Sequence, residues 1–221
     1  MARACSVSLA PEMTPAELAA LMQIISERGL PGKHLEIGTA AGGTLCKMLV
    51  AAKHHPPFVV VDTMKYFPNQ HETVLENLRK NGLPINQVDI RAMTSIEACK
   101  QAHKAGETFD FVLIDGIHKF LYVMQDLRWA QSLNVSGILV LHDYSANFPG
   151  VQWAADYFLS RNPNYRKVKL ADSLLVLEKS GDDPVSGVVI MPAFFAQLIH
   201  FYLQAMSSIK KRMNRWRQRQ P

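Results

Sequence analysis

The sequence predicts an α/β protein of the doubly wound, Rossmann-like type, in which helices cover both faces of a mostly parallel sheet. Three observations lead to this prediction. Strand and helix patterns alternate along the chain from about residue 33 to residue 161. Two expected strands, 58–61 and 111–114, are continuous apolar runs, as in a parallel sheet that is buried on both faces. The first strand passes through a glycine-containing turn directly into a helix.

This strand–turn–helix unit carries the most specific motif of the chain. The pattern from Glu36 to Gly43 is E-x-G-x-x-x-G-G, which differs from the G-x-G-x-x-G turn that cradles a pyrophosphate. Gly38 permits a sharp turn of the backbone, whereas Gly42 and Gly43 permit a ligand to approach the main chain closely. The motif therefore predicts a cofactor that has no pyrophosphate.

A helix is expected before this unit. The segment Thr14-Pro15-Ala16-Glu17 has the pattern of a capping box with proline at the first helical position. We expect the helix to run to about Arg28, because Gly29 and Pro31 follow and end it.

The remaining elements follow in alternation. Strands are expected near 33–38, 57–62, 87–91, 109–115 and 136–142. Helices are expected near 43–53, 69–81, 94–105, 119–132 and 150–161. Residues 165–179 alternate between polar and apolar, which predicts a closing pair of strands that turns near 171–173 and brings the sheet to seven strands.

A linker signal divides the chain into residues 1–180 and a C-terminal segment, 181–221. The signal is Gly181-Asp182-Asp183-Pro184. Beyond it, apolar residues recur at spacings of three and four, as in one long amphipathic helix or two helices broken near Ser207-Ser208. Such a helix either packs on the core with a solvated basic end or forms an interfacial or partner-binding surface. The apolar positions are Met191, Phe194, Phe195, Leu198, Tyr202, Met206, Ile209, Met213 and Trp216.

Composition and charge narrow the class of protein. A chain of 221 residues with 48% hydrophobic content can bury one sizeable core, and it has no run of 18 apolar residues. The net charge is +5, but six positive charges and no acid lie in residues 210–219, so the rest carries −1. We therefore expect no nucleic-acid partner. The basic tail, with Trp216, either contacts an anionic membrane surface or is a solvated helix end.

The cysteines indicate the compartment. Cys5, Cys46 and Cys99 are odd in number and lack the spacing of metal ligands. We therefore expect reduced thiols in a cytoplasmic protein. Peripheral contact with the inner membrane surface is left open.

Acidic residues occur in and after the first two strands. Asp62 ends the second strand, 24 positions after Gly38, where an acid can accept hydrogen bonds from both hydroxyls of a ribose. The alternative role for Asp62 is a turn or helix-capping acid. Glu36 lies inside an apolar strand, and since a buried carboxylate is costly without a partner, it predicts a polar role.

Three segments together resemble the class I S-adenosylmethionine-dependent methyltransferases. They are residues 34–44, 109–118 and 137–144, which match that family's first, fourth and fifth strands with the turns that follow. The resemblance covers roughly residues 14–180 and is closest to the branch with small-molecule and sugar O-methyltransferases and the cephalosporin hydroxylase group. It implies that residues 1–180 form the methyltransferase domain and that the last strand of the sheet is antiparallel.

The resemblance also implies S-adenosylmethionine as cofactor and assigns residues to it. Glu36 looks like the motif acid that orients the amino-acid end, and Thr44 matches a hydroxyl directed at the carboxylate near a helix start. Thr94 and Ser95 lie where relatives contact adenine, or else they cap a helix. The expected cofactor-binding residues are Glu36, Gly38, Thr39, Ala40, Gly42, Thr44, Asp62, Thr63, Thr94, Ser95 and Asp115.

The expected reaction centre comprises Asp115, His118, His142 and Asp143. Asp115 and Asp143 match the acids with which metal-dependent relatives hold a divalent cation, and His142 replaces a third oxygen ligand. Imidazole suits Mn or Fe better than Mg, so the metal is left open. His118 lies where the catechol-type enzymes carry a lysine that takes the proton of the acceptor, and imidazole can do the same. We therefore expect His118 and Asp115 to be catalytic.

Three functions follow from these residues. The leading one is O-methylation of a small molecule or sugar. The alternative keeps the fold but performs metal-dependent hydroxylation, with two histidines and a carboxylate around iron. The third is a non-enzymatic module that binds membrane surfaces through the tail. Aromatic residues beyond the strand ends either wall the acceptor pocket or pack as ordinary core, and the oligomeric state is open. These aromatic residues are Phe67, Tyr144, Phe148 and Trp153.

Overall fold

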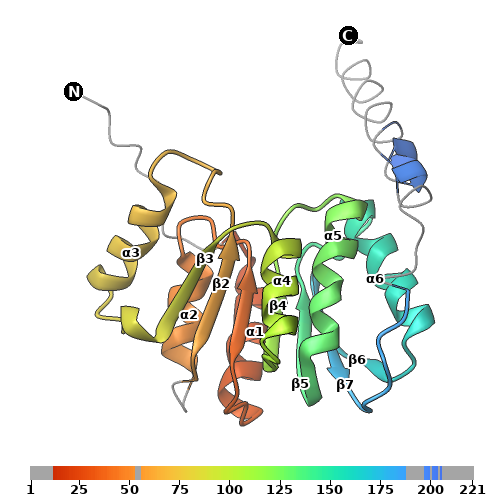
Figure 1. The fold of residues 1–221 in the computed structure, drawn as a ribbon, viewed down its shortest axis with the longest axis horizontal. Helices are drawn as coiled ribbons and strands as arrows, with labels where there is room; N and C mark the ends of the chain where they lie inside the picture. The colour runs from red at the N-terminus through yellow and green to blue at the C-terminus, as the bar shows by residue number, and fades with distance from the viewer. Residues whose placement is uncertain (1–11, 53–55, 188–196, 200, 204, 206–221) are drawn as a thin grey trace.

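The computed structural model describes residues 12–52, 56–187, 197–199, 201–203 and 205. The chain forms a seven-stranded sheet with the strand order β3-β2-β1-β4-β5-β7-β6 (Figure 1). The strands are β1 His34–Ile37, β2 Phe58–Asp62, β3 Val88–Ala92, β4 Phe109–Ile114, β5 Leu133–Leu141, β6 Tyr165–Ala171 and β7 Leu174–Lys179. The helices are α1 Pro15–Glu27, α2 Gly43–Ala51, α3 Gln70–Lys80, α4 Ser95–Lys104, α5 Phe120–Asp126 and α6 Pro149–Arg161, with 3-10 turns η1 Ile85–Gln87 and η2 Leu127–Ser132.

The order and direction of the strands confirm the predicted fold. β1 to β5 are parallel, whereas β7 runs antiparallel to both β5 and β6. β6 and β7 form the expected closing pair, which turns at residues 172 and 173. The sheet is therefore mostly parallel with seven strands and an antiparallel strand near its end.

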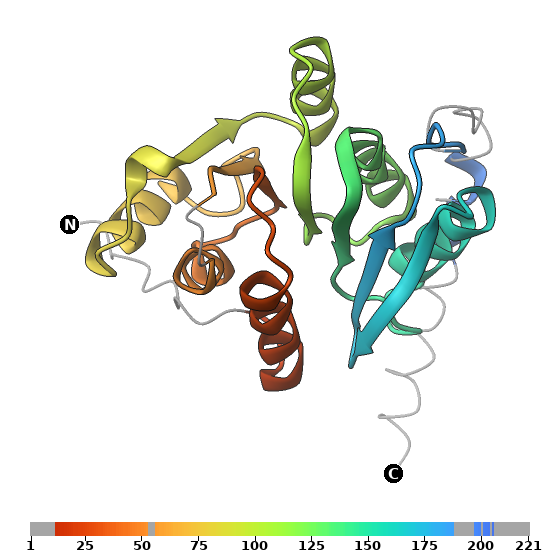
Figure 2. The same cartoon turned by 90° about the horizontal axis from the view of Figure 1, so that it is seen from below.

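Helices cover both faces of the sheet, as Figure 2 shows in the view from below. α1, α2 and α3 pack on one face, where residues such as Val60 and Leu113 form a core cluster. α4, α5 and α6 pack on the other face, around residues such as Leu35 and Val112. Because alternate strand residues enter the two clusters, the strands are apolar throughout, which explains the continuous runs in the sequence.

One predicted helix needs correction. The expected helix over 119–132 is α-helical only from Phe120 to Asp126, after which the chain continues as the 3-10 turn η2 to Ser132. In η2 the indole of Trp129 is fully buried and donates to the Ser95 hydroxyl at 3.0 Å. The tighter turn thus accompanies a contact with α4 that periodicity alone does not reveal.

The C-terminal segment is described only in part. Residues 197–199, 201–203 and 205 are helical, and Leu203 is buried against the core while Tyr202 contacts the ring of Trp153. The basic tail, 210–219, the break near Ser207-Ser208 and most of the expected apolar positions lie outside the described residues, as does Cys5. Cys46 and Cys99 are buried free thiols. In the described ranges, no helix combines the length and apolar character needed to cross a membrane.

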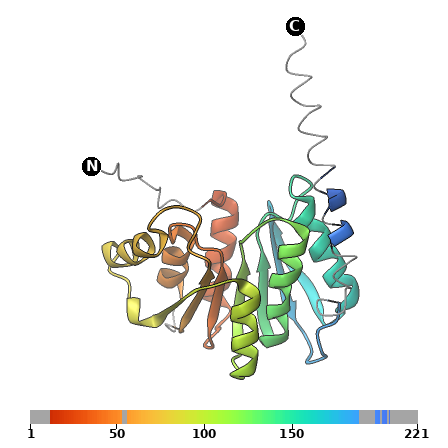
Figure 3. The same cartoon turned by 45° about the horizontal axis from the view of Figure 1, so that its top comes forward.

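The register of four parallel strands sets the position of the polar residues. Ile37 pairs with Val61 of β2 and with Ile114 of β4, and Ile114 pairs with Leu141 of β5. The next residue of each strand therefore falls in one row along the carboxyl edge of the sheet, which faces the viewer more directly in Figure 3. In strand order, this row is Asp62, Gly38, Asp115 and His142.

Backbone contacts at Gly38 hold the row together. Its amide donates to the carbonyl of Val61 at 3.0 Å, and the amide of Asp115 donates to the carbonyl of Ile37 at 2.9 Å. Gly38 has φ +83°, and a Cβ there would lie 2.4 Å from the carbonyl oxygen of Asp115. Glycine is required at this position for both conformation and space.

Replacing Gly38 by alanine should therefore destabilise the protein strongly. Gly82 provides a matched control, because it also has a positive φ, +66°, but has no atom within 4 Å of an added Cβ. We expect Gly82→Ala to lower the free energy of unfolding by about 1 kcal/mol, from backbone strain alone. Gly38→Ala should cost roughly 3 kcal/mol or more, because strain and steric overlap add. Urea unfolding of both variants measures the difference, and equal losses would contradict the close approach.

Candidate functional site

A cavity of about 750 Å³ lies at the carboxyl edge of the sheet. Its wall comes from the ends of β1, β2 and β4, the loop after β3 and the beginning of α2, with α5 at one side. Most of the residues predicted to bind a cofactor or to react line this cavity. They are Glu36, Gly38, Thr39, Ala40, Thr44, Asp62, Thr63, Thr94, Ser95, Asp115 and His118.

Three predicted site residues are not in the wall of the cavity. Gly42 has φ +85°, and a Cβ there would face Val74 of α3 at 3.4 Å, so this glycine serves the turn and its packing. The expected approach of a ligand to the main chain falls at Gly43, which lines the cavity. His142 and Asp143 lie beside it and join the cluster described below.

Two polar atoms at the Glu36 end of the cavity wall make no hydrogen bond within the described part of the chain. They are Oε2 of Glu36 and Oγ1 of Thr39. The Glu36 side chain is only 1% exposed, and burial raises its pKa to about 8, with the charges of Asp115 and Asp62 acting in the same direction. An unpaired buried carboxyl group is costly, so this end of the cavity suits a ligand that donates hydrogen bonds or carries positive charge.

Asp62 is held in place by three donors. Its Oδ2 accepts from the amide of Thr39 at 3.0 Å and from the side chain of Gln70 at 3.2 Å, and its Oδ1 accepts from the amide of Met64 at 2.7 Å. The Gln70 amide also donates to the carbonyl of Ala40. α3 thus fixes both the strand-end acid and the turn, and Oδ1 of Asp62, which accepts one hydrogen bond, keeps a lone pair for a hydroxyl donor.

Thr94 and Ser95 have structural partners as well as positions in the cavity wall. Thr94 is the N-cap of α4 and forms a capping box with Glu97. Ser95 accepts from Trp129 and hydrogen-bonds to the buried carboxyl group of Asp126, whose pKa burial raises to about 7. Thr94 therefore caps α4, Ser95 is bound to Trp129 and Asp126, and both residues also line the cavity.

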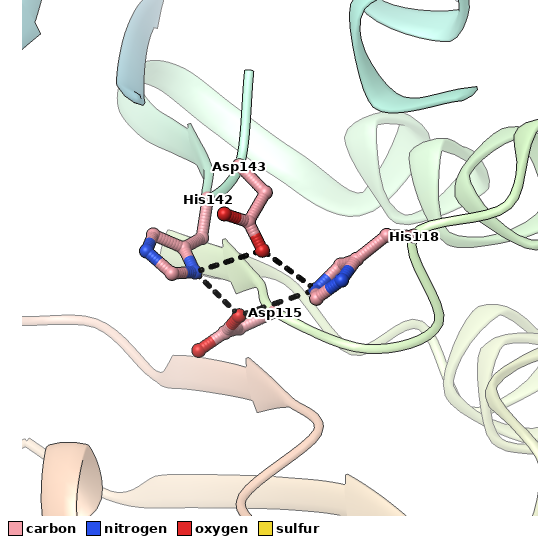
Figure 4. A group of neighbouring side chains, drawn as sticks. All are labelled: Asp115, His118, His142 and Asp143. Atoms are coloured by element: carbon pink, nitrogen blue, oxygen red, sulfur yellow. Dashed lines mark hydrogen bonds and ion pairs between the residues drawn. The ribbon is translucent and has the colours of Figure 1, made fainter. Parts of the chain in front are cut away.

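Asp115, His118, His142 and Asp143 form one group, the strand-end cluster (Figure 4). One ligand atom from each residue lies within 4.8 Å of the others. Asp115 and Asp143 follow β4 and β5, and His118 reaches over from the loop after β4. Two carboxylates and two imidazoles at this spacing are a donor set that suits a divalent transition metal.

His118 faces the two carboxylates of the cluster. Its Nε2 lies 3.1 Å from Oδ2 of Asp143 and 3.8 Å from Oδ1 of Asp115. This nitrogen is buried and makes no hydrogen bond within the described residues, although the side chain is 34% exposed. The ring packs edge-on against Phe148, with 5.0 Å between centroids. A buried nitrogen without a hydrogen bond beside a cavity can exchange a proton with a bound group.

His142 lies between carboxylates on both sides. Its Nδ1 is 2.9 Å from Oδ1 of Asp115, and its Nε2 is 3.3 Å from Oε2 of Glu17 in α1. Burial alone would lower the pKa of His142, but Asp115, Asp143 and Glu17 outweigh it and raise the pKa to about 9. Burial likewise opposes ionisation of Asp115, yet the neighbouring imidazoles hold the pKa of Asp115 below its usual value.

Sequence reasoning did not assign Glu17 or Asp126 to the site. Glu17 was expected only as part of a capping box, which it does form with Thr14, but it also reaches His142. Asp126 is an acid on the buried face of α5, beside Val123 and Leu127. An acid among buried apolar positions was the available signal for Asp126.

The aromatic residues considered for an acceptor pocket take different positions. Phe148 contacts His118, whereas Phe67 contacts Tyr66. The hydroxyl of Tyr144 donates to Asp156, and Trp153 contacts Tyr202. Of these four, Phe148 is the residue that packs against the strand-end cluster.

A family model described as a methyltransferase domain matches residues 35–144. No curated protein matches the chain. The segment matched by the family model runs from within β1 to just beyond β5 and includes the strand-end cluster. It leaves out α1 and the β6–β7 pair.

Several solved structures share the fold. An O-methyltransferase from Bacillus cereus in complex with SAH has a TM-score of 0.63 at 14% identity, over 77% of this chain and 83% of that one. TomG from Streptomyces achromogenes, an O-methyltransferase of tomaymycin synthesis in complex with SAM, has a TM-score of 0.63 at 14% identity, over 76% of this chain and 82% of that one. CalS11, the TDP-rhamnose 3'-O-methyltransferase of calicheamicin biosynthesis, has a TM-score of 0.59 at 15% identity, over 73% of this chain and 76% of that one. At these identities the likeness shows the fold.

The buried acid of β1 gives a prediction for stability without ligand. The pKa of Glu36 is about 8 in the folded chain and has the ordinary value of 4.5 when unfolded, so between these limits the folded state holds the extra proton. The free energy of unfolding should then fall as pH rises through this window, on the order of 2 kcal/mol relative to Glu36→Gln. Urea unfolding at pH 5, 6.5 and 8 measures this slope. Glu76→Gln, an exposed change on α3, should leave it unaltered, and parallel profiles for wild type and Glu36→Gln would contradict the burial argument.

Proposed function

The chain belongs to the class I S-adenosylmethionine-dependent methyltransferases, and on that premise we propose that it methylates a hydroxyl group of a small molecule or sugar. The observation that carries the proposal is the continuity of one cavity from Glu36 to His118. A group bound beside Glu36 and Asp62 would have its reactive end near the strand-end cluster. The solved relatives with the same fold include O-methyltransferases, one of which acts on a rhamnose nucleotide.

The unpaired polar atoms fit the cofactor chemically. S-adenosylmethionine, when bound, supplies an activated methyl group together with an ammonium, a carboxylate and a ribose. Glu36 Oε2 and Thr39 Oγ1 are the buried acceptors available to the ammonium. Thr44 lies in the first turn of α2, where its hydroxyl would donate to the carboxylate near the helix N-terminus. Asp62 would accept from a ribose hydroxyl through the remaining lone pair of its Oδ1.

The chain's part in methyl transfer is to align the acceptor and to remove its proton. Asp115 and His118 line the same cavity, so a hydroxyl placed there meets both groups. Nε2 of His118, which makes no hydrogen bond within the described residues, would take the proton as the oxygen reacts, and Asp115 and Asp143 would stabilise the resulting imidazolium. The packing of Phe148 against the ring limits water on one side.

We further propose that the strand-end cluster holds a divalent cation. The distances suit such a site, because the four ligand atoms lie within 4.8 Å of one another. Asp115, His142 and Asp143 would be the ligands, and a cation there would lower the pKa of an acceptor hydroxyl. With nitrogen in the donor set, manganese or iron is favoured over magnesium. The same donors, with both histidines, support metal-dependent hydroxylation as the second candidate function.

The proposal extends to the place of action. We propose a cytoplasmic enzyme whose basic tail, 210–219, contacts an anionic membrane surface. The support is the charge distribution of the sequence, since six positive charges beside Trp216 contrast with −1 on the remainder. The competing account is a solvated helix end. Cosedimentation with anionic liposomes, with and without residues 210–221, separates the two.

Cofactor binding is the first test. We expect S-adenosylhomocysteine to bind by calorimetry, and Asp62→Ala to weaken that binding by about 1–3 kcal/mol because charge-assisted hydrogen bonds are lost. Asp62 also holds the amides of Thr39 and Met64, so Asp62→Asn, which keeps one acceptor oxygen, controls for damage to the turn. No binding to the wild type, with tight binding of NAD instead, would refute the proposal.

Metal and base are tested separately. Excess chelator should abolish methyl transfer, and Asp143→Ala should do the same if the cation is required. His118→Gln should lower kcat by about 10²-fold or more, because it removes the base while leaving the cofactor pocket intact. His103→Gln on the exposed face of α4 is the matched control. Full activity in excess chelator would refute the metal requirement but not the role of His118 as base. An unchanged kcat for His118→Gln would refute that role.

A further inference from the structure

We propose that Glu17 is a positioning residue for the reaction centre. Its carboxylate accepts a hydrogen bond from Nε2–H of His142 and thereby keeps Nδ1 of that ring directed into the strand-end cluster. The inference rests on the proposed metal site and adds to it a residue 125 positions away in sequence, on a helix outside the cluster.

The orientation of the His142 ring carries the first step. Nδ1 lies 2.9 Å from Oδ1 of Asp115 and 3.6 Å from Oδ2 of Asp143, so this nitrogen belongs to the cluster. Figure 4 shows the other ring nitrogen pointing away from the cluster. On that side, Nε2 meets Oε2 of Glu17 at 3.3 Å, and both side chains are buried, with His142 6% exposed and Glu17 2% exposed.

The Glu17 carboxylate cannot readily turn away from His142. Its Oε1 accepts from the Ser173 amide at 2.9 Å and from the Ser173 hydroxyl at 2.6 Å. Its Oε2 accepts from the Thr14 amide at 2.8 Å. These neighbours all act as donors, so the carboxylate presents an acceptor to His142. Contacts from the start of α1 and from the turn between β6 and β7 thus fix the direction of this acceptor.

Only one ring nitrogen of His142 is available as a metal ligand. A carboxylate is an acceptor only, so the ring nitrogen that faces Glu17 must carry a hydrogen. In the imidazole that ligates a cation, the lone pair is then on Nδ1, the atom that faces Asp115 and Asp143. A carboxylate behind a ligating histidine is the recurrent way in which proteins select tautomer and ring orientation.

This arrangement answers a problem that a histidine creates at the end of β5. A carboxylate in that position offers two equivalent oxygens, whereas imidazole offers one ligand atom in one orientation. A ring flipped about its axis would direct a carbon at the cluster. Glu17 removes that freedom, and the cost of burying its charge is offset by the Ser173 and Thr14 donors.

The experiment measures Mn²⁺ binding to the full-length protein by calorimetry. Glu17→Ala should raise the Kd for Mn²⁺ by 10- to 100-fold, the range found when a carboxylate behind a metal ligand is removed. Glu17→Gln keeps one oxygen for Nε2–H and should recover part of the loss. Binding of S-adenosylhomocysteine should stay within about twofold, because Glu17 does not line the cavity.

Ser173→Ala is the matched control for a purely structural role. It deletes a hydrogen bond to the far side of the Glu17 carboxylate and leaves the contact with His142 in place. We expect its Mn²⁺ affinity to lie much closer to the wild type than that of Glu17→Ala, because the amides of Ser173 and Thr14 still hold the carboxylate. If Ser173→Ala loses as much as Glu17→Ala, or if Glu17→Ala binds Mn²⁺ like the wild type, the positioning role is wrong. Circular dichroism checks each fold, and Glu17→Gln carries the test if the alanine variant unfolds.

A second measurement separates this inference from the metal proposal. Protein with ¹⁵N-labelled histidine should show a protected Nε2–H signal for His142 in the wild type and in Ser173→Ala, and its loss in Glu17→Ala. A wild type that binds no Mn²⁺ but shows this pattern would end the metal proposal and keep the role of Glu17. An unchanged signal in Glu17→Ala would overturn the inference, whatever the metal does.

Discussion

The register between β2, β1, β4 and β5 is the constraint on which the rest of this structure depends. Because Ile37 pairs with both Val61 and Ile114, the residues that follow these strands fall in one row. Gly38 stands in the middle of that row, and its contact with the Asp115 carbonyl leaves no space for a side chain. A shift of one residue in any of these pairs would take at least one strand-end residue out of the row.

The two apolar layers allow this edge to hold groups that would be unfavourable elsewhere. Glu36 is buried without a full set of partners, and Nε2 of His118 makes no hydrogen bond within the described residues. Such groups persist because the surrounding strands are packed on both faces. Of the four buried polar atoms that make no hydrogen bond within the described residues, those of Glu36, Thr39 and His118 line one cavity. The groups proposed to bind the cofactor and the group proposed to act as base are therefore both buried polar groups without a full set of hydrogen bonds.

The sequence predicted most of the fold because its signals are local. Continuous apolar runs, the turn at Gly38 and the capping box at Thr14 each depend on neighbouring residues, and all three appear in the structure. The change to a 3-10 turn after Asp126 was missed, since it accompanies a contact between Trp129 and α4. Gly42 was expected to face a ligand, but spacing does not tell which side of the turn packs against α3. Glu17 was hidden for the same reason, because nothing local to α1 indicates a contact with His142.

The contacts between Glu17, Ser173 and His142 connect the segment matched by the family model with the elements on either side of it. The matched methyltransferase segment begins at residue 35 and ends at 144, so it holds the strand-end cluster but neither Glu17 nor Ser173. The cavity and the cluster come from the shared segment, while the groups behind the ring come from flanking elements that the family model does not include. A shortened or chimeric enzyme built on the shared segment would inherit the pocket and lose what orients its imidazole. In this chain, the segment that matches the family model is shorter than the set of elements proposed to build the reaction centre.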